Sequence, residues 1–303
     1  MTAPDVTRNS ESEDITVCQV CGSAERTLKF EDGPYRVYTC SACTFVYVTP
    51  RLTGQALLDV YNETYWKSDN PKVRGYADYA SESALYLKKR MKLVSKWLPK
   101  KGRILDVGCA AGYFLRIAQQ HGHDVHGVEL SKAIAQEAIQ SLGKDRIYNG
   151  LLDDAVTARG WQDHSFDLIT IWDVIEHVPE PQSLLASIKK LIKPGGKLLL
   201  ETQNVNSRLA NRLGKRWHHY KHDEHLYHFN PDTISRLLTD CGYEVLTCGS
   251  SYAGKYVSFG FLAERAGRLG TIPGLLAKPL ALLKPCNLYV NPHDEIIVIA
   301  EPS

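Results

Sequence analysis

From residue 102 onward, short apolar runs alternate with longer segments in which apolar residues recur at helical spacing. The runs expected of buried strands are Ile104 to Val107, Val125 to Val128, Phe166 to Ile171 and Lys197 to Glu201. The helical segments extend from about Gly112 to Gln120, Lys132 to Leu142, Pro181 to Ile192 and Pro231 to Cys241. Strands that alternate with helices predict an α/β fold, in which a parallel sheet is covered by helices on both faces.

The pattern in the last part of the chain predicts that one strand of this sheet runs antiparallel to the others. Tyr243 to Cys248 and Asp294 to Ala300 are both strand-like, and we expect them to pair antiparallel at the sheet edge. Residues 251–292 form an insertion between these strands, with apolar stretches at Val257 to Leu262 and Leu275 to Leu283. We expect this insertion to be helical and to form either a lid over the site or a surface in contact with lipid.

The first hundred residues show three further patterns. Residues 1–14 are polar and acidic, which predicts a disordered tail. Residues 15–48 combine paired cysteines with short alternating segments, which predicts a small module of short strands. Residues 49–100 look helical and are rich in aromatic side chains, so we expect a linker or lid that folds over an acceptor pocket. The main domain is then residues 101–303.

Composition narrows the class of protein without identifying it. The chain has 303 residues, of which 44% are hydrophobic and 23% charged, and its formal net charge is +2. This near-neutral balance gives no global argument for a nucleic-acid or membrane-surface protein. The N-terminus lacks the basic start and apolar core of a signal peptide, and no apolar stretch is long enough to span a membrane, so we expect a soluble, cytoplasmic protein. The oligomeric state is left open.

Two cysteine pairs carry the first chemical signal. Cys18-x-x-Cys21 and Cys40-x-x-Cys43 have the spacing of the paired knuckles that hold a structural zinc ion in a tetrahedral four-thiolate site. A redox-active dithiol is the alternative, but two equivalent pairs in one short segment favour zinc. The segment has few basic residues that are not matched by acids, which favours a docking or scaffold role over nucleic-acid binding.

The second signal is the turn that follows the first strand of the main domain. Asp106, Gly108 and Gly112 form the pattern D-x-G-x-x-x-G, whereas the dinucleotide fingerprint G-x-G-x-x-G is not met. The glycines allow a ligand to approach the backbone closely, and the helix start presents free N–H groups to a carboxylate. Glu129 ends the next strand, where its carboxylate can accept hydrogen bonds from both hydroxyls of a ribose.

These blocks, together with Ser165 to Trp172 and Leu191 to Gly196, resemble the class I S-adenosylmethionine-dependent methyltransferases over residues 102–250. The resemblance implies a Rossmann-like, seven-stranded, mostly parallel sheet with an antiparallel edge strand, and S-adenosylmethionine as the cofactor. It places the methionine end at the glycine turn, the ribose at Glu129 and the adenine near Leu130 and Leu151, although Leu151 replaces the usual polar residue. The cofactor residues that it implies are Asp106, Gly108, Cys109, Gly112, Tyr113, Glu129, Leu130, Leu151, Leu152 and Trp172.

Candidate residues for chemistry at the methyl acceptor follow the strand expected at Phe166 to Ile171. Asp173, Glu176 and His177 have spacings of three and four, which would bring them to one helical face. His177 could act as a general base, because the pKa of imidazole lies near neutrality. Alternatively, these residues only cap and pack the helix that is expected to follow the strand. The arrangement also resembles ubiquinone-pathway O-methyltransferases and small-RNA 2′-O-methyltransferases, which implies a divalent ion with His222 or His225 as a further ligand.

The segment from Trp217 to His228 contains five histidines, His218, His219, His222, His225 and His228, which together mark the acceptor site. Basic residues occur within and just before this segment, mixed with Trp217 and Tyr220: Arg208, Arg212, Lys215, Arg216 and Lys221. Such a mixture suits an acceptor that carries phosphate, or RNA, but it also occurs on a solvated helix face.

The sequence therefore predicts an S-adenosylmethionine-dependent methyltransferase for a small-molecule acceptor such as a sugar derivative, a phenol or a polyketide. O-methylation is favoured over C-methylation, although a similar zinc module precedes the methyltransferase domain of sugar C-methyltransferases. Two alternatives remain, namely RNA methylation and a non-enzymatic, cofactor-binding adaptor that recruits partners through the zinc module. RNA binding would require a continuous basic surface, whereas a small-molecule enzyme would require a closed pocket.

Overall fold

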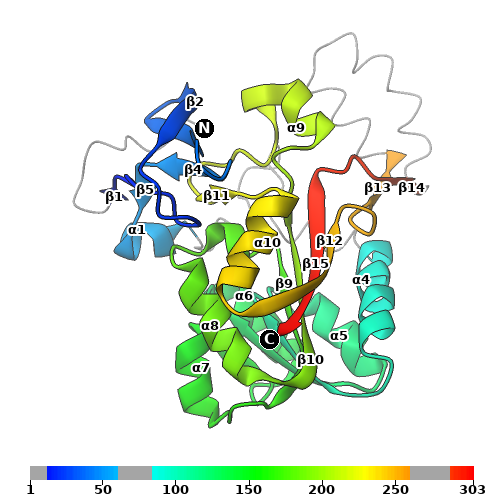
Figure 1. The fold of residues 1–303 in the computed structure, drawn as a ribbon. Coiled ribbons are helices and arrows are strands. Elements are labelled where there is room, and N and C mark those ends of the chain that lie inside the picture. Colours follow the sequence, from blue (N-terminus) through cyan, green and yellow to red (C-terminus); the bar gives the residue numbers. More distant parts are fainter. Residues whose placement is uncertain (1–11, 61–83, 260–286) are drawn as a thin grey trace.

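The computed structural model describes residues 12–60, 84–259 and 287–303. Its centre is a seven-stranded sheet in the order β12-β15-β10-β9-β6-β7-β8 (Figure 1). The strands are β6 (Arg103–Val107), β7 (Asp124–Glu129), β8 (Ile147–Asn149), β9 (Phe166–Trp172), β10 (Ile192–Gln203), β12 (Tyr243–Gly249) and β15 (Glu295–Pro302). The predicted α/β fold is confirmed. The strand that runs antiparallel to its neighbours is β15, which lies one place inside the edge strand β12.

Helices cover both faces of this sheet, because alternate strand residues point to opposite sides. On one face, Leu105, Ile169 and Leu200 pack with α7 (Leu152–Arg159), α8 (Pro181–Leu191) and α10 (Pro231–Asp240). On the other, Ile104, Leu168 and Leu199 pack with α4 (Ala84–Trp97), α5 (Tyr113–Gln120) and α6 (Lys132–Leu142). The predicted helices therefore have their expected positions, and β8 and α7 are additions that the sequence pattern did not predict.

A second, smaller sheet sits at the end of the main sheet where β9 and β10 terminate (Figure 1). Its order is β11-β4-β3-β2, with β2 (Arg26–Asp32), β3 (Tyr35–Cys40), β4 (Val46–Thr49) and β11 (Tyr227–His228). Three of these strands belong to the cysteine-containing segment, but β11 comes from the histidine-rich segment. The N-terminal module is thus completed by residues of the main domain.

Short elements continue the N-terminal region. They are β1 (Ser12–Glu13), which pairs with β5 (Arg51–Leu52), and α1 (Gly54–Asp59). The Arg51 side chain donates to the Pro179 carbonyl over 3.0 Å and so ties this region to the loop before α8. The predicted tail, apart from residues 12–14, and the aromatic residues at 61–83 of the predicted linker lie outside the described residues.

The insertion at 251–292 differs from its prediction in the parts that are described. Its ends are not helical but form β13 (Lys255–Ser258) and β14 (Asn287–Val290), which pair antiparallel from Lys255 opposite Val290 to Ser258 opposite Asn287. Aromatic and β-branched side chains in both strands favour this pairing over a helix. Residues 260–286 lie outside the described residues. Among the helices that the structure does describe, none has the length and apolar character needed to cross a membrane.

Candidate functional site

The turn after β6 has the backbone shape that its glycines predict. Gly108 and Gly112 have φ angles of 75° and 72°, in the left-handed region that other residues adopt only with strain. A Cβ atom at Gly108 would lie 2.4 Å from Cγ2 of Val174, and one at Gly112 would lie 2.8 Å from Cδ1 of Leu142. Both positions therefore require glycine, for conformation and for space.

Asp106 lies directly before this turn, at the carboxyl end of β6, and is only 2% exposed. Its Oδ1 accepts a hydrogen bond from Oγ1 of Thr170 on the neighbouring strand β9, over 2.6 Å. Burial raises the pKa of Asp106 to about 7, and the hydrogen bond and the charge of Arg90 only partly oppose this shift. A cation bound beside Asp106 would therefore stabilise its ionised form.

Glu129 closes the other side of the turn. Its Oε2 accepts from the amide of Ala110 over 3.0 Å, and its Oε1 accepts from the amide of Ser131 over 2.8 Å. Burial raises the pKa of Glu129, while these amide hydrogen bonds favour the charged form. Each carboxylate oxygen has two lone pairs, so both can accept a further hydrogen bond from a ligand.

Two exposed leucines mark the ends of β7 and β8. Leu130 is 37% exposed and Leu151 is 59% exposed, which is unusual for large apolar side chains. The Asn149 side chain donates to the carbonyls of Glu129 and Leu130, both over 2.9 Å, and so joins the two strand ends. The two leucines offer apolar surface on which a flat ring could pack.

The other four predicted cofactor residues are less open. The side chains of Cys109, Leu152 and Trp172 are 5%, 5% and 6% exposed and pack in the core beneath the turn. Tyr113, at the first position of α5, is half-buried and has the guanidinium of Arg116 over its ring. The exposed part of the candidate cofactor site is therefore formed by the turn, Glu129 and the two leucines.

Beyond β9, the predicted helical face does not exist. Asp173 has a φ angle of 56°, which turns the chain away from a helical path. Only a single turn of 3₁₀ helix, η1 (Ile175–His177), follows. The Asp173 carboxylate accepts from Arg90 of α4 over 2.9 Å and does not belong to the group that Glu176 and His177 form with His225. The prediction that all three side chains share one face is wrong.

Glu176, His177 and His225 instead form a compact group, with one ligand atom of each within 4.8 Å of the others. Glu176 is 1% exposed, and its Oε2 accepts from Oγ1 of Thr202 on β10 over 3.0 Å. The rings of His177 and His225 meet edge to face, with centroids 4.6 Å apart. Of His222 and His225, the two histidines predicted as a further metal ligand, the structure brings His225 to this group.

The protonation of this group follows from its burial. Desolvation lowers the pKa of His177 to about 4 and also lowers that of His225, whereas it raises the pKa of Glu176. His177 is thus neutral at pH 7, and the 3.0 Å contact of its Nδ1 with the Glu224 carbonyl assigns the proton to Nδ1. Its Nε2 then keeps a lone pair. Nδ1 of His225 is buried without a hydrogen-bond partner among the described residues.

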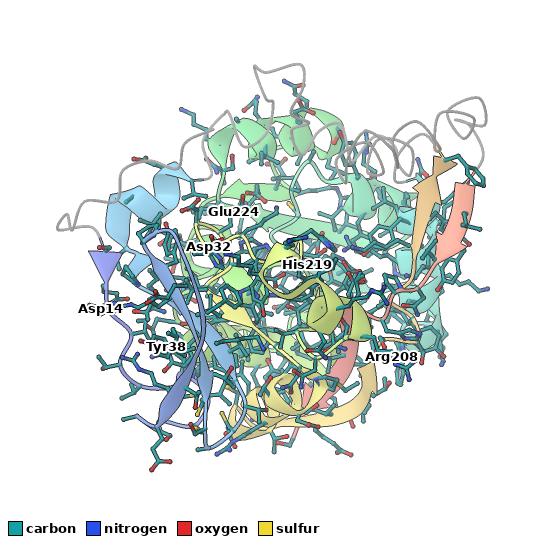
Figure 2. The ribbon with its side chains drawn as sticks, turned by 90° about the horizontal axis from the view of Figure 1, so that it is seen from above. Asp14, Asp32, Tyr38, Arg208, His219 and Glu224 are labelled. Atoms are coloured by element: carbon teal, nitrogen blue, oxygen red, sulfur yellow. The ribbon has the colours of Figure 1, made fainter. Side chains whose placement is uncertain are left out.

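His222, the other predicted partner, belongs to a different contact. Its Nε2 lies 3.4 Å from Oδ2 of Asp32 on β2, and its ring lies 5.6 Å from that of Tyr35. Figure 2 shows Asp32 of the N-terminal sheet facing the segment that carries His219 and Glu224. His222 therefore joins the N-terminal sheet to the histidine-rich segment.

An arginine-centred network next to the site was not predicted from the sequence. Arg90 is 8% exposed and donates to Oε2 of Glu201 over 2.9 and 2.7 Å, as well as to Asp173. Tyr86 donates to the same Glu201 oxygen over 2.7 Å, and the guanidinium lies 4.3 Å from the ring centroid of Trp172. An arginine on the buried face of a helix and an acid in a buried strand were the signals that could have revealed it.

The four predicted zinc ligands come together in the N-terminal module. Cys18, Cys21, Cys40 and Cys43 are free thiols whose sulfur atoms all lie within 4.8 Å of one another. The Cys18–Cys43 and Cys21–Cys40 sulfur distances are both 3.5 Å. Tetrahedral zinc with Zn–S bonds of about 2.3 Å would place its sulfurs about 3.8 Å apart, so the thiols need only small shifts to fit the ion.

The chain is similar to known proteins in its sequence and in its fold. Residues 79–247 match a family described as a methyltransferase domain. A ubiquinone biosynthesis O-methyltransferase from Coxiella burnetii is 32% identical over 118 residues, which cover 39% of this chain and 50% of that protein. The one from Xanthomonas axonopodis pv. citri is 31% identical over 145 residues, covering 44% and 61%. The chain thus spans about half the length of the curated relatives that it matches.

The fold is also similar to a solved structure, that of the PH0226 protein from Pyrococcus horikoshii OT3. The TM-score is 0.50 at 15% sequence identity, and the match covers 79% of this chain and 95% of that one. Identity at this level supports the fold alone.

Proposed function

The chain belongs to the methyltransferase domain family, and we propose that it transfers a methyl group from S-adenosylmethionine to an oxygen atom of a small-molecule acceptor. The observation that carries the proposal is the group of Glu176 and His177, which follow β9, with His225 from the histidine-rich segment. Glu176 and His225 are buried and His177 is half-buried. Similarity to ubiquinone biosynthesis O-methyltransferases supports oxygen as the acceptor atom.

The cofactor fits the residues around the turn. Gly108 and Gly112 let its methionine end approach the backbone, and Asp106 offers a buried carboxylate to a positively charged group. Glu129 has lone pairs left for the ribose hydroxyls, and Leu130 and Leu151 present apolar surface to the adenine. In this proposal, Cys109, Leu152 and Trp172 act by supporting the turn from the core.

The acceptor oxygen must approach the methyl group in line with the bond that breaks, so positioning is the main task of the protein. If the acceptor carries a proton, the neutral His177 can remove it with Nε2, because Nδ1 is held by the Glu224 carbonyl. A divalent ion also fits Glu176, His177 and His225, since Nδ1 of His225 has no hydrogen-bond partner among the described residues. Such an ion would polarise the acceptor hydroxyl and lower its pKa.

The N-terminal cysteines have a structural role in this proposal. Zinc bound by Cys18, Cys21, Cys40 and Cys43 would stabilise a sheet that has only a small core of its own. Because β11 completes that sheet, the zinc site would also support the histidine-rich segment beside the acceptor group.

The proposal is tested by methyl transfer from labelled S-adenosylmethionine to a panel of phenols, catechols and sugar derivatives. Replacing His177 by Ala is expected to lower kcat about 100-fold to 10,000-fold, with cofactor affinity in calorimetry unchanged. His121→Ala, at the exposed end of α5, is the matched control and should keep full activity. Full activity of both His177→Ala and Glu176→Gln on every acceptor would refute the role given to this group.

The same assay separates the base from the metal. With a divalent ion at the site, Glu176→Gln and chelation of the wild-type protein should both lower kcat, and added metal should restore the wild-type protein alone. With His177 as a base and no ion at this group, chelation under conditions that leave the zinc content of the four-cysteine site unchanged should not change kcat. The pH dependence of kcat then reports the titration of the base.

RNA is a second candidate acceptor, favoured by one observation. Arg208 and Arg212 on α9 (Arg208–Leu213), and Lys215 and Arg216 on η2 (Gly214–Arg216), are all exposed. An RNA substrate would bind with an affinity that falls steeply with salt and that drops when these four residues are replaced together. A small-molecule acceptor would show neither effect.

A further inference from the structure

A second group of metal-ligand side chains includes two of the five histidines that the sequence predicted to mark the acceptor site. His218 and His219, which follow η2, meet Asp294, which directly precedes β15, and one ligand atom of each lies within 4.8 Å of the others. The group has its own carboxylate and shares no residue with the Glu176, His177 and His225 group. Figure 2 places His219 near the centre of the molecule, in the segment beside the N-terminal sheet.

The distances within this group suit shared ligands better than hydrogen bonds. Nε2 of His218 lies 3.7 Å from Oδ2 of Asp294, and Nε2 of His219 lies 3.9 Å from the same oxygen. Both distances exceed the range of about 2.7–3.2 Å for N–H···O hydrogen bonds. Nitrogen and oxygen ligands about 2.1 Å from one ion lie about 3.0–3.4 Å apart, so the two distances to Asp294 would have to shorten by about 0.3–0.9 Å to hold an ion.

Burial adds a second, independent observation. Nε2 of His219 is buried and has no hydrogen-bond partner among the described residues, although an unsatisfied buried nitrogen is costly. The Asp294 side chain is 4% exposed, while that of His218 is 42% exposed. The site has one open side, at His218.

The backbone beneath these ligands is fixed by packing and hydrogen bonds. Trp217 is 1% exposed, and its ring centroid lies 4.9 Å from that of His219 and 6.3 Å from that of His218. The carbonyl of Asp294 accepts from the amide of Asn204 over 2.7 Å. Both ends of the group are therefore held in place without the ion.

The charge around the group leaves Asp294 as its anionic ligand. The neighbouring Glu295 has Oε1 3.9 Å from Nε2 of His219, but the same oxygen is paired with the ammonium of Lys255. Because this pair is neutral, it neither competes for a cation nor repels one strongly. Two imidazoles and one carboxylate with an open side are the ligand set of divalent first-row transition metals.

We propose that His218, His219 and Asp294 bind a divalent transition-metal ion of the zinc, nickel, cobalt or iron class. This site shares no ligand with the four-cysteine site or with the acceptor group, although the ring centroid of His219 lies 6.0 Å from that of His225. Its existence does not depend on methyl transfer, so binding tests it without an activity assay.

The experiment is calorimetric titration of the full chain with nickel chloride, because imidazole ligands favour nickel and the zinc content of the cysteine site can be followed in parallel. Wild-type protein is expected to bind nickel at this site, and His219→Ala and Asp294→Asn are expected to weaken that binding at least tenfold. Glu176→Gln, which removes a ligand of the acceptor group alone, should keep it.

His218→Ala guards against a variant that fails to fold, because His218 is the exposed ligand and its replacement leaves the core intact. It should also weaken nickel binding, with an unchanged circular dichroism spectrum and unchanged zinc content. The proposal is overturned if wild-type protein binds no nickel, if the three variants bind it as tightly as wild type, or if Glu176→Gln alone removes the binding.

Discussion

The cofactor half and the acceptor half of this molecule are built in different ways. Around the glycine turn, the contacts stay within the main domain, with separations of 19 residues between Glu129 and Ala110 and 64 residues between Asp106 and Thr170. Around the histidine-rich segment, they join the N-terminal module to residues of the main domain that lie far along the chain. Tyr35 donates to Asp223 at a separation of 188 residues, and Asn230 donates to Thr44 at a separation of 186.

This difference decides what a change in each half does. A local turn depends on a few backbone angles, so one substitution can abolish binding while the rest of the fold survives. A surface assembled from distant segments depends on the elements that bring those segments together. The four predictions that follow test this contrast, in order of decreasing effect.

The largest effect is expected from removal of the cysteine site. With Cys40→Ser and Cys43→Ser combined, zinc content should fall to zero and the free energy of unfolding should drop by several kcal/mol, because structural zinc contributes about 10 kcal/mol or more to folding in small modules. The affinity for S-adenosylmethionine should change less than about twofold, since the candidate cofactor site and the four-cysteine site share no residue. Zinc analysis, chemical denaturation and calorimetry measure these three quantities.

Methyl transfer in this double variant should be lost together with the zinc. If the contrast between the halves is wrong, cofactor affinity will fall in parallel with zinc content. Cys241→Ser, a free cysteine at the end of α10, serves as the control for thiol replacement.

Arg90 gives the next largest effect, because it joins the two halves. Its replacement by Ala leaves the buried carboxylate of Glu201 without its cation, which typically costs about 3–5 kcal/mol of stability. Chemical denaturation of Arg90→Ala measures the loss, and Lys88→Ala, an exposed position on the same helix, should be near wild type. A loss no larger than that of the control would mean that the network contributes little.

Gly108→Val tests the cofactor half directly. A Cβ atom would meet Val174 at 2.4 Å and would force a positive φ on a β-branched residue, so cofactor affinity should fall about 100-fold or more. The zinc content of Gly108→Val should remain that of wild type. The cysteine variant, by contrast, should lose zinc and keep its affinity for the cofactor. Calorimetry measures the cofactor affinity and zinc analysis measures the zinc content of the same preparation. Complete loss of zinc from Gly108→Val would contradict the prediction that the two halves respond separately.

The smallest effect concerns Asp106 and pH. The buried carboxylate has a pKa of about 7 in the cofactor-free protein, and a bound cation favours its ionised form. Cofactor affinity should therefore fall as the pH drops below 7, by about tenfold between pH 7.5 and pH 6. In Asp106→Asn this dependence should disappear, while the overall affinity is lower at every pH. If cofactor affinity depends on pH in Asp106→Asn as it does in wild type, a group other than Asp106 takes up the proton.

The sequence predicted most of the main sheet because its strands and helices are long and strongly patterned. It missed β8, which has only three residues, and α7, in which acidic residues interrupt the apolar positions. The glycine turn and Glu129 were predictable because one short stretch of chain forms the whole constellation.

The acceptor half was harder to predict because its residues are placed by other elements. Spacing alone suggested that Asp173, Glu176 and His177 share a face, but Arg90 and the positive φ angle at Asp173 separate them. His222 and His225 were equal candidates in the sequence, and only the approach of β2 to one and of η1 to the other distinguishes them.

The pairing of β4 with β11 has a consequence for anyone who would divide or recombine this protein. A truncation near residue 50 would divide the smaller sheet, because its last strand, Tyr227 and His228, belongs to the main domain. The shortened protein would keep a bare strand edge and the uncovered ring of Tyr227, both of which invite aggregation. A chimera that exchanges the N-terminal part must therefore carry Leu226 to Asn230 with it.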